Sequence, residues 1–331
     1  MKILRALSLV AVLALAGGPA FAVTAEKVNT ATFGETSKDT KKDAKDAKQP
    51  QPLTAAAQIL LSRRSISPGV IDGMDGENYH KAIAQFRRQN GLGDGDQLDE
   101  ATWFALGIGS TGPLVIEYEL TKKDVRTHFA RSIPRDYAKQ AKMKRLAYTS
   151  ATEMFAERFH MSEGLLKALN PKANFRKTGE KIFVASVERE VPTAPAERLE
   201  ANKATGMLVV YGPANAILAS YPATIGSEET PSPSGEYTIK RIAKNPTYHY
   251  DPEKNFQQGR NKHKLVLPAG PNNPVGTVWI ALSKPTFGIH GTPEPSQVSK
   301  TSSHGCIRLT NWDVEELAGM VKKDLTVRFV D

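Results

Sequence analysis

The single cysteine of this 331-residue chain, Cys306, lies close to two histidines and is the strongest candidate for covalent chemistry. A thiol attacks a carbonyl as the thiolate, and a neighbouring imidazole that takes the proton lowers the pKa of the thiol. His304 precedes Cys306 by two residues, a spacing that puts both side chains on one face of a strand. His290, followed by Gly291, lies in a separate run. The pattern predicts nucleophilic catalysis by the thiol, with either histidine as the base.

The neighbours of Cys306 supply other groups that such a reaction needs. Gly305 has no Cβ, so a substrate carbonyl can approach the backbone, and the amides of Gly305 and Cys306 are candidates for an oxyanion hole. Arg308 has the planar fork that matches a carboxylate, although a structural ion pair explains it equally well. The other candidates for substrate binding are Ser303, Tyr250 and Trp279, and aromatic residues of a β domain also serve as packing.

A lone cysteine has other interpretations. It is an inert buried thiol if neither histidine reaches it. His290, His304 and Cys306 are also zinc-ligand types, but no paired-cysteine spacing and no fourth ligand accompany them. We therefore expect no metal and no cofactor.

Residues 205–331, which contain this motif, have the patterns of a mostly β domain. The domain is large enough to build a core of its own. One helix, at about residues 312–322, interrupts the strands. The expected strands are 207–211, 217–221, 235–239, 278–282, 287–290 and 325–329.

A small helical unit is expected at residues 53–108. Apolar residues at helical spacing predict a bundle of about three helices. The turn before the second helix contains Gly73 and Gly76, both expected to need positive φ. Asp99 is the expected N-cap of the last helix.

A second small unit is expected at residues 146–187. Ser150 and Ser162 are the expected caps of two helices, and a strand follows at 181–184. We expect the order strand, helix, helix, strand within these bounds.

Four segments lie outside these units. Residues 1–22 have the basic start, apolar run and small cleavage residues of a signal peptide, with an uncleaved anchor as the alternative. Residues 23–52 are rich in Lys, Asp, Thr and Ala, and predict a disordered linker. Residues 109–145 form a connector without an assigned function, and 188–204 a polar linker.

Charge bears on the partner of an exported chain. Without residues 1–22, 42 Lys and Arg stand against 35 Asp and Glu, a net charge of +7. An exported protein rarely meets nucleic acid, so the excess favours an acidic cell-wall polymer. No other segment is long and apolar enough to span a membrane.

The residues around the two histidines resemble a known family. The runs Ile289–Thr292 and Ser303–Leu309 together resemble the L,D-transpeptidase (YkuD-type) catalytic domain, over about residues 205–331. The run Phe86–Leu92 and its neighbours resemble a peptidoglycan-binding domain, and residues 146–187 resemble a LysM module. The resemblance implies a multidomain α+β protein, with a mostly β catalytic domain after a helical bundle and a βααβ module.

The resemblance also implies roles for individual residues. Cys306 is the acylated nucleophile, and His290 is the base, its ring held by the carbonyl of Gly291. His304 then orients the site. Some members have asparagine two places after the cysteine, where this chain has Arg308, which leaves the contacts to substrate open.

The implied reaction takes place on peptidoglycan in the periplasm. Cys306 attacks the carbonyl of the third residue of a stem peptide and expels the terminal D-alanine. An amine then resolves the thioester: another stem peptide gives a 3→3 cross-link, and an outer-membrane protein or lipoprotein becomes tethered to the wall. The alternatives are a carboxypeptidase that uses water, a papain-like wall hydrolase, disfavoured because His290 precedes Cys306, and a non-catalytic wall anchor.

Overall fold

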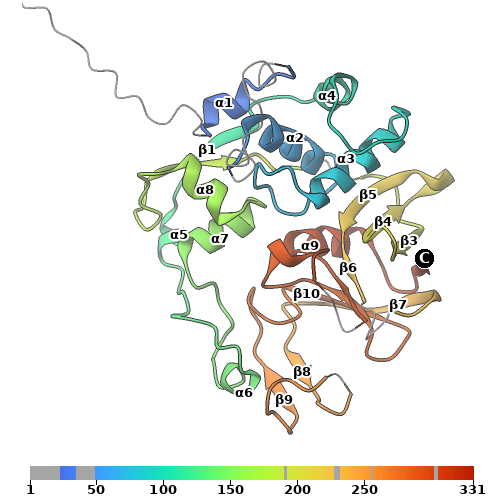
Figure 1. Ribbon diagram of the computed structural model, residues 1–331. Helices are drawn as coiled ribbons and strands as arrows, with labels where there is room; N and C mark the ends of the chain where they lie inside the picture. Colours follow the sequence, from blue (N-terminus) through green and yellow to red (C-terminus); the bar gives the residue numbers. More distant parts are fainter. Residues whose placement is uncertain (1–22, 35–48, 190–191, 227–231, 255, 302–304) are drawn as a thin grey trace, which may run out of the picture.

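The computed structural model describes residues 23–34, 49–189, 192–226, 232–254, 256–301 and 305–331. The expected signal peptide, residues 1–22, and residues 35–48 of the expected linker lie outside this part of the chain. Within it, no helix is long and apolar enough to cross a membrane. Figure 1 shows helical units of the first half of the chain beside a β-rich C-terminal half.

The C-terminal half is built on a nine-stranded sheet that curls into a nearly closed barrel. Its end strands, β5 (Ile217–Pro222) and β6 (Thr224–Ile225), are consecutive in the chain, so the sheet must bend round to bring its two edges together. The order is β5-β4-β3-β13-β7-β10-β11-β12-β6. The other strands are β3 (Arg198–Asn202), β4 (Met207–Tyr211), β7 (Gly235–Lys244), β10 (Val278–Leu282), β11 (Gly288–His290), β12 (Ile307–Arg308) and β13 (Thr326–Val330).

One apolar core fills this domain. Ile280 of β10 and Ile289 of β11 are fully buried in it, and helix α9 (Asn311–Met320) contributes Val314 and Leu317. All the expected strands and the expected helix are present, although β7 continues five residues beyond its expected end, to Lys244. Because α9 starts directly after β12, it ties the end of the cysteine motif to the core.

The first helical unit contains the three expected helices, α2 (Pro52–Arg63), α3 (Glu77–Gln89) and α4 (Glu100–Gly107). Asp99 caps α4 as predicted, accepting a bond from the amide of Thr102 at 2.7 Å. Gly73 has the expected positive φ of 71°. Gly76 does not: its φ is −116°, because it is the extended N-cap of α3.

The second unit differs from its expected bounds. Helices α7 (Ala151–Arg158) and α8 (Glu163–Leu169) and strand β2 (Lys181–Ala185) are present, and Ser150 and Ser162 cap the helices as predicted. The first strand, however, is β1 (Val115–Glu119), which pairs antiparallel with β2. The expected start near residue 146 is therefore wrong, because a long insertion separates the first strand from the helices.

This insertion, residues 120–149, is called the arm below. It contains α5 (Lys122–Val125) and α6 (Tyr137–Gln140) and reaches the hairpin of β8 (Tyr248–Tyr250) and β9 (Leu265–Leu267) in the C-terminal half (Figure 1). The Tyr137 ring packs edge-on against Tyr248 and Tyr250, with centroids 5.9 and 5.4 Å away. The connector expected at 109–145 is thus a structural bridge.

Two expected linkers also carry structure. In the segment 23–52, α1 (Ala25–Asn29) buries Val28, and the Asn29 side chain bonds the backbone of Val115 at 2.8 and 2.9 Å. The described part of that segment is therefore not a disordered tether. In the segment 188–204, β3 belongs to the sheet. Short 3-10 turns complete the chain at Pro213–Asn215 and Pro295–Gln297.

Candidate active site

Two parallel strands bring the candidate base and nucleophile together. In the pairing of β11 with β12, Ile289 lies opposite Ile307 and His290 opposite Arg308. Continued by one residue beyond Ile289 and Ile307, this register puts Cys306 beside Gly288. Because side chains alternate along a strand, His290, Arg308 and Cys306 share one face. The fold thus brings together the two separate runs found in the sequence.

The ring of His290 is held on two sides. Its Nδ1 lies 2.7 Å from the carbonyl oxygen of Gly291, which can only accept, so Nδ1 carries the proton and Nε2 can accept one. The ring also stacks on Trp279, with centroids 5.5 Å apart and planes at 22°. The side chain is 8% exposed. His290 is therefore positioned as a neutral imidazole with Nε2 free to act as a base.

Burial governs the charge of both groups. It lowers the pKa of His290 to about 4; the bond to Gly291 opposes the shift and the charge of Arg308 adds to it. Burial also raises the pKa of Cys306 to about 11, against the effect of a backbone bond from Gly288. Burial thus favours a neutral imidazole and a neutral thiol over the expected imidazolium–thiolate pair. We expect the proton to move when substrate is bound.

Glycines give these groups room. A Cβ on Gly288 would lie 2.6 Å from the Trp279 ring. A Cβ on Gly291 or on Gly276 would lie 2.2 or 2.1 Å from Oδ1 of Asn311. A side chain at any of the three would displace the groups that flank the imidazole.

Asn311 is a residue that sequence reasoning missed. Its Oδ1 accepts from the amide of Thr277 at 3.1 Å, and its Nδ2 donates to the carbonyl of Pro271 at 3.1 Å and to Glu157 at 3.0 Å. It therefore braces the backbone behind His290 and links it to α7. Its position five residues after the cysteine was the only signal, and the spacing alone does not reveal the contact.

The backbone before the cysteine has a constrained shape. Gly305 has a φ of 93°, which favours glycine, and its carbonyl accepts a bond from the buried Ser232 hydroxyl at 2.7 Å. The oxyanion hole expected from the amides of Gly305 and Cys306 stays a prediction. Ser303 and His304 lie outside the described residues.

A cavity of about 380 Å³ lies on the thiol side of the site. Trp279, Tyr248 and Thr286 line it, and the Cys306 thiol donates to the carbonyl of Thr286 at 3.7 Å. The expected role of Trp279 in a substrate groove is compatible with this place. That of Tyr250 is not: Tyr250 is 1% exposed and packs in the cluster between the hairpin and the arm.

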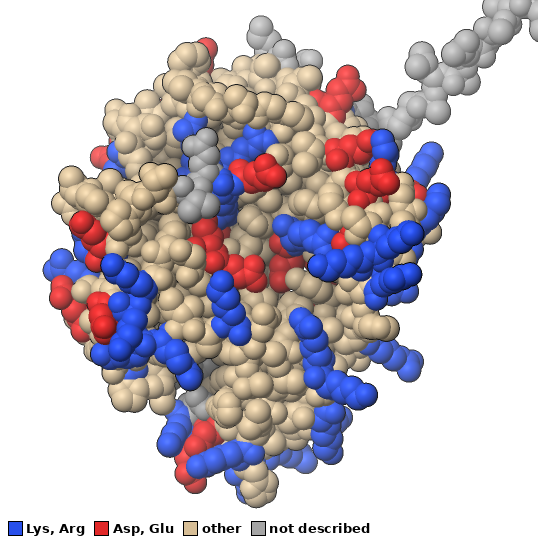
Figure 2. Space-filling model, turned by 180° about the vertical axis from the view of Figure 1, so that it is seen from behind, with Lys and Arg blue, Asp and Glu red and all other residues tan. Residues whose placement is uncertain are grey.

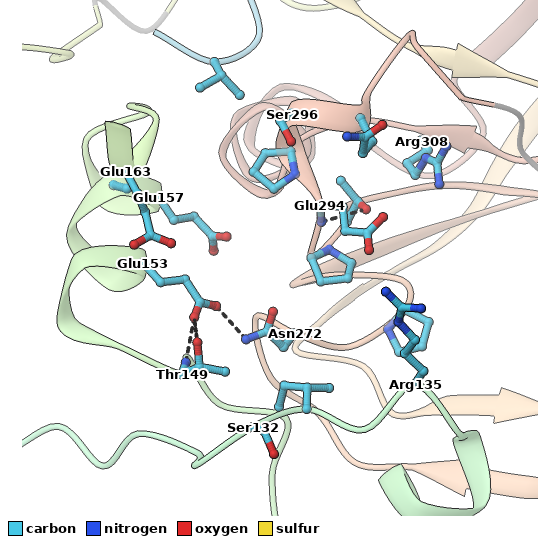
Figure 3. Close-up of a pocket in the computed structure, with 18 of the residues that line it drawn as sticks. Ser132, Arg135, Thr149, Glu153, Glu157, Glu163, Asn272, Glu294, Ser296 and Arg308 are labelled. Carbon is cyan, nitrogen blue, oxygen red and sulfur yellow. Dashed lines mark hydrogen bonds between the residues drawn. The ribbon is translucent and has the colours of Figure 1, made fainter. Parts of the chain in front are cut away.

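A larger cleft of about 1250 Å³ opens on the other side. Arg308 and Glu294 line it from the catalytic domain, residues 131–135 and Tyr137 from the arm, and Glu153, Glu157 and Glu163 from α7 and α8. Figure 3 shows these three glutamates on one wall, with Glu294, Arg308 and Arg135 across from them. Of the residues that line this cleft, sequence reasoning proposed only Arg308 for substrate binding, because the other walls come from the arm and from a separate unit.

Metal ligands are not grouped in the described part of the chain. No three His, Cys, Asp or Glu side chains within it are placed to hold an ion.

Known proteins match the part of the chain that holds this site. Residues 196–329 match the family model of the YkuD L,D-transpeptidase catalytic domain. A putative L,D-transpeptidase YkuD of Bacillus subtilis is 34% identical over 107 residues, which are 32% of this chain and 50% of that protein. A probable L,D-transpeptidase ErfK/SrfK of Escherichia coli is 27% identical over 189 residues, 55% of this chain and 60% of that protein. This chain thus spans about half of the relatives' lengths.

Solved structures give a weaker likeness. L,D-transpeptidase 3 from Mycobacterium tuberculosis is 15% identical, with a TM-score of 0.35 over 48% of this chain and 78% of that one. An L,D-transpeptidase from Mycobacterium smegmatis is 15% identical, with a TM-score of 0.33 over 48% and 77%. Scores this low do not establish a common arrangement of the chains.

Proposed function

We propose that this chain, whose residues 196–329 match the L,D-transpeptidase catalytic domain, is a peptidoglycan L,D-transpeptidase with Cys306 as nucleophile and His290 as base. The observation that carries the proposal is the bond from His290 Nδ1 to Gly291, which leaves Nε2 to accept a proton on the face shared with Cys306. This geometry suits acyl transfer to a thiol. The relatives that match this domain are named as L,D-transpeptidases.

Acylation begins from the neutral pair. The thiol proton passes to Nε2 of His290 as sulfur bonds to the carbonyl carbon of the third stem-peptide residue. The amides of Gly305 and Cys306 stabilise the oxyanion. The C–N bond to the terminal D-alanine then breaks, and the imidazolium returns the proton to the leaving amine. A thioester on Cys306 and free D-alanine result.

The thioester is resolved by an amine. Attack on the carbonyl carbon releases the thiol and forms an amide. A second stem peptide gives a 3→3 cross-link, and a protein acceptor gives a protein tethered to the wall.

The other units support work at the wall. We propose that residues 53–108 bind peptidoglycan and that the unit built on β1, α7, α8 and β2 binds its glycan, as a LysM module does. The chain then acts after export, at the wall in the periplasm. The net charge of +7 that remains without residues 1–22 suits an acidic polymer.

Mass spectrometry tests the proposal. The purified protein is incubated with disaccharide-tetrapeptide, beside Cys306→Ala and His290→Gln. We expect dimers linked between third residues, absent with Cys306→Ala and strongly reduced with His290→Gln. Loss of D-alanine without dimers would identify a carboxypeptidase or a missing protein acceptor. No reaction of the wild-type chain would favour a non-catalytic anchor.

A further inference from the structure

The excess positive charge of the chain lies on the arm, residues 120–149. The arm has nine Lys and Arg and two Asp, a net charge of +7. In the rest of residues 23–331, 33 Lys and Arg are balanced by 33 Asp and Glu. The net charge of the chain without its first 22 residues is thus a property of the arm, and not of the surface as a whole.

The basic side chains of the arm face solvent without acidic partners. All nine are exposed, from Lys122 at its start to Arg145 at its end. None of them forms an ion pair with any residue that the structure describes. Of the two aspartates, Asp124 is buried and pairs with Arg158 at 2.7 Å, and Asp136 accepts from backbone amides as the N-cap of α6. Like charges so concentrated repel each other in the free protein, and a bound polyanion relieves that repulsion.

The fold holds these charges in a fixed row. The two helices of the arm have only four residues each, so most of its length is not helical. Ile133, Tyr137 and Leu146 turn inward and pack with Tyr250 and Leu267 of the hairpin in one cluster. Because the apolar side chains face the hairpin, the basic ones remain on the outer side. A backbone that is ordered before binding loses little conformational entropy when a ligand binds.

The loop between β8 and β9 extends the row. Its Gln258 donates to the carbonyl of Arg135 at 2.9 Å, and its Asn261 donates to Asp136 at 3.4 Å. Arg260 and Lys262 of the same loop are exposed. Figure 2 shows basic side chains gathered over the lower end of the molecule, the end at which Figure 1 places α6, β8 and β9. The nine basic residues of the arm, with these two of the loop, are called the basic surface below.

The composition of the basic surface distinguishes between classes of polyanion. Among the exposed large apolar side chains of the described residues, none belongs to the arm, and only Val266 belongs to the hairpin. A segment that binds a membrane surface inserts apolar side chains beside its basic ones. Single-stranded nucleic acid stacks its bases on aromatic rings, whereas Phe129 and Tyr137 are packed against the protein. The basic surface offers charge spread along a line, which fits a linear polymer with spaced anionic groups.

We propose that the basic surface is a docking site for a peptidoglycan strand and that it binds the free carboxylates of the stem peptides along that strand. The proposal rests on the proposed L,D-transpeptidase function, which identifies the polymer. It gives a function to the arm, which lies outside residues 196–329, the part that matches the catalytic domain. Because the arm joins the second unit to the hairpin, a strand bound along it lies across both.

Binding to purified peptidoglycan sacculi tests the proposal. The full chain carries Cys306→Ala, so that binding is not confused with covalent attachment, and sedimentation gives the bound fraction. Contacts between exposed charges are screened by salt, so we expect the Kd to rise at least about tenfold between about 50 and about 500 mM salt. A Kd that does not change with salt would overturn the proposal.

Matched charge variants locate the binding. The arm variant carries Lys139→Gln, Lys142→Gln, Lys144→Gln and Arg145→Gln, and we expect its Kd to be about tenfold higher, because each exposed contact contributes modestly. The control variant loses the same number of charges at exposed positions of the C-terminal half, and its Kd should stay within about twofold of the parent. Its changes are Lys240→Gln, Lys322→Gln, Lys323→Gln and Arg328→Gln. Equal losses in the two variants would show that net charge, and not the arm, determines binding.

A charge-preserving variant guards against misfolding as the cause. Lys139→Arg, Lys142→Arg and Lys144→Arg together change the same positions and keep the charge of the arm. This variant should bind sacculi as the parent does. A loss as large as that of the arm variant would mean that the side chains at these positions support the fold and do not bind the strand.

Two further probes identify the ligand. Sacculi whose free carboxylates have been converted to neutral amides should bind about tenfold more weakly than untreated sacculi. Vesicles of phosphatidylglycerol and phosphatidylcholine in equal parts present a lipid surface, and they should bind more weakly than untreated sacculi. Undiminished binding to the amidated sacculi, or tighter binding to the vesicles, would contradict a carboxylate-bearing strand as the partner.

The docking site and the proposed function can fail separately. Formation of an acyl-enzyme by the wild-type chain with disaccharide-tetrapeptide tests the function, and binding to sacculi tests the arm. An acyl-enzyme, together with equal binding by the arm and control variants, would overturn the docking site alone. Binding that depends on the arm, without any acyl-enzyme, would overturn the enzymatic function and leave the docking site in place.

Discussion

At the scale of single residues, the site combines a weak base with a weakly acidic thiol. Burial is the main cause for both, and Arg308 adds to it at His290. A site with neutral groups holds no reactive thiolate, so we expect adventitious oxidation and alkylation of Cys306 to be slow. We expect the reactive form only when a substrate carbonyl is bound.

Replacing Arg308 tests how much its charge lowers the pKa of His290. In Arg308→Met the positive charge is lost and burial remains, so the pKa of His290 should rise from about 4 but stay below its ordinary 6.5. NMR titration of the imidazole between pH 3 and 8 measures it. Arg328→Met, an exposed change on β13, is the control. A pKa that falls or stays at about 4 would contradict the electrostatic role of Arg308.

The rate of alkylation tests the raised pKa of the Cys306 thiol. With a pKa of about 11, Cys306 should react with iodoacetamide slowly at pH 7, and the rate should rise about tenfold per pH unit up to pH 9.5. Intact mass gives the rate at each pH. A rate that levels off below pH 8 would mean that an imidazolium–thiolate pair exists after all.

The sequence was sufficient to propose the reacting residues and insufficient to predict their surroundings. Cys306 and His290 stand out because the motif fixes residue types around them. Asn311 and Tyr250 do not, because their roles depend on contacts across the fold. Asn311 fills the space left by two glycines, and Tyr250 is buried by an arm whose place no local pattern indicates.

At the scale of elements, Asn311 packs so closely against Gly276 behind His290 that no side chain fits at position 276. Gly276 and Gly91 both have positive φ, 64° and 65°. A Cβ at Gly276 would lie 2.1 Å from Asn311, whereas nothing lies within 4 Å of one at Gly91. Both Gly→Ala changes therefore cost about 1 kcal/mol of backbone strain, and Gly276→Ala adds about 1–3 kcal/mol of overpacking.

Urea unfolding of Gly276→Ala and Gly91→Ala measures the difference in their free energies of unfolding. The rate of acylation of Cys306 by the donor peptide shows whether the active site is intact. We expect Gly276→Ala to lose both stability and acylation, since Asn311 must move away from Gly291. Gly91→Ala should acylate normally. Equal losses of stability in the two variants would show that Asn311 is not held against Gly276.

A buried carboxyl joins α7 to the catalytic domain and makes that junction sensitive to pH. Burial raises the pKa of Glu157 to about 7, with Glu315 and Glu153 adding to the shift and bonds from Asn311 and Tyr148 opposing it. A raised folded-state pKa means that the protonated form is stabilised by folding. This stability is complete below the unfolded value of about 4.5 and is lost as pH rises through about 7.

Glu157→Gln should remove this dependence, because glutamine keeps an oxygen for Tyr148 and Asn311 and carries no charge. We expect the Tm of the wild type to fall more than that of the variant between pH 5 and pH 8. Differential scanning calorimetry at both pH values measures it, and the difference between the two proteins cancels other titrating groups. If the Tm of both proteins changed equally with pH, the Glu157 carboxylate would be hydrated, not buried.

Helices and strands were predictable where a local sequence pattern indicates them. The strands of the catalytic domain, the three helices of residues 53–108 and the caps Asp99, Ser150 and Ser162 follow from periodicity and capping chemistry. The pairing of β1 with β2 was not predictable, because residues 120–180 separate the two strands. The structure of the arm was not predictable either, because its apolar residues are buried only by contact with β8 and β9.

At the scale of the whole molecule, α9 is the place where the units meet. Arg189 pairs with Asp313 at 3.4 Å and with Glu316, and it donates to Ser62 of the first helical unit at 3.1 Å. Ser67 of that unit donates to Asp313 at 2.9 Å. Figure 2 shows acidic side chains gathered near the middle of one face of the molecule and basic ones spread around them. The units therefore form one body around the site.

Arg189→Ala should destabilise the protein more than the loss of an exposed ion pair does. Asp313 is fully buried, and loss of its cation leaves an uncompensated charge that costs about 3–5 kcal/mol. Lys181→Ala is the matched control, because its pair with Glu117 is exposed and contributes little to stability. Urea unfolding followed by both tryptophan fluorescence and circular dichroism measures the cost and shows whether the two signals still coincide.

The double variant Arg189→Met, Asp313→Asn separates charge from packing. It removes both charges and keeps most of the volume, so it should recover a large part of the stability lost in Arg189→Ala. If the units act as one body, Arg189→Ala also splits a single unfolding transition into two, and the double variant restores one. A loss in Arg189→Ala no greater than in Lys181→Ala would mean that the junction is hydrated and that the units move independently. In that case the larger cleft, whose walls come from both sides of the junction, would open and close with their motion.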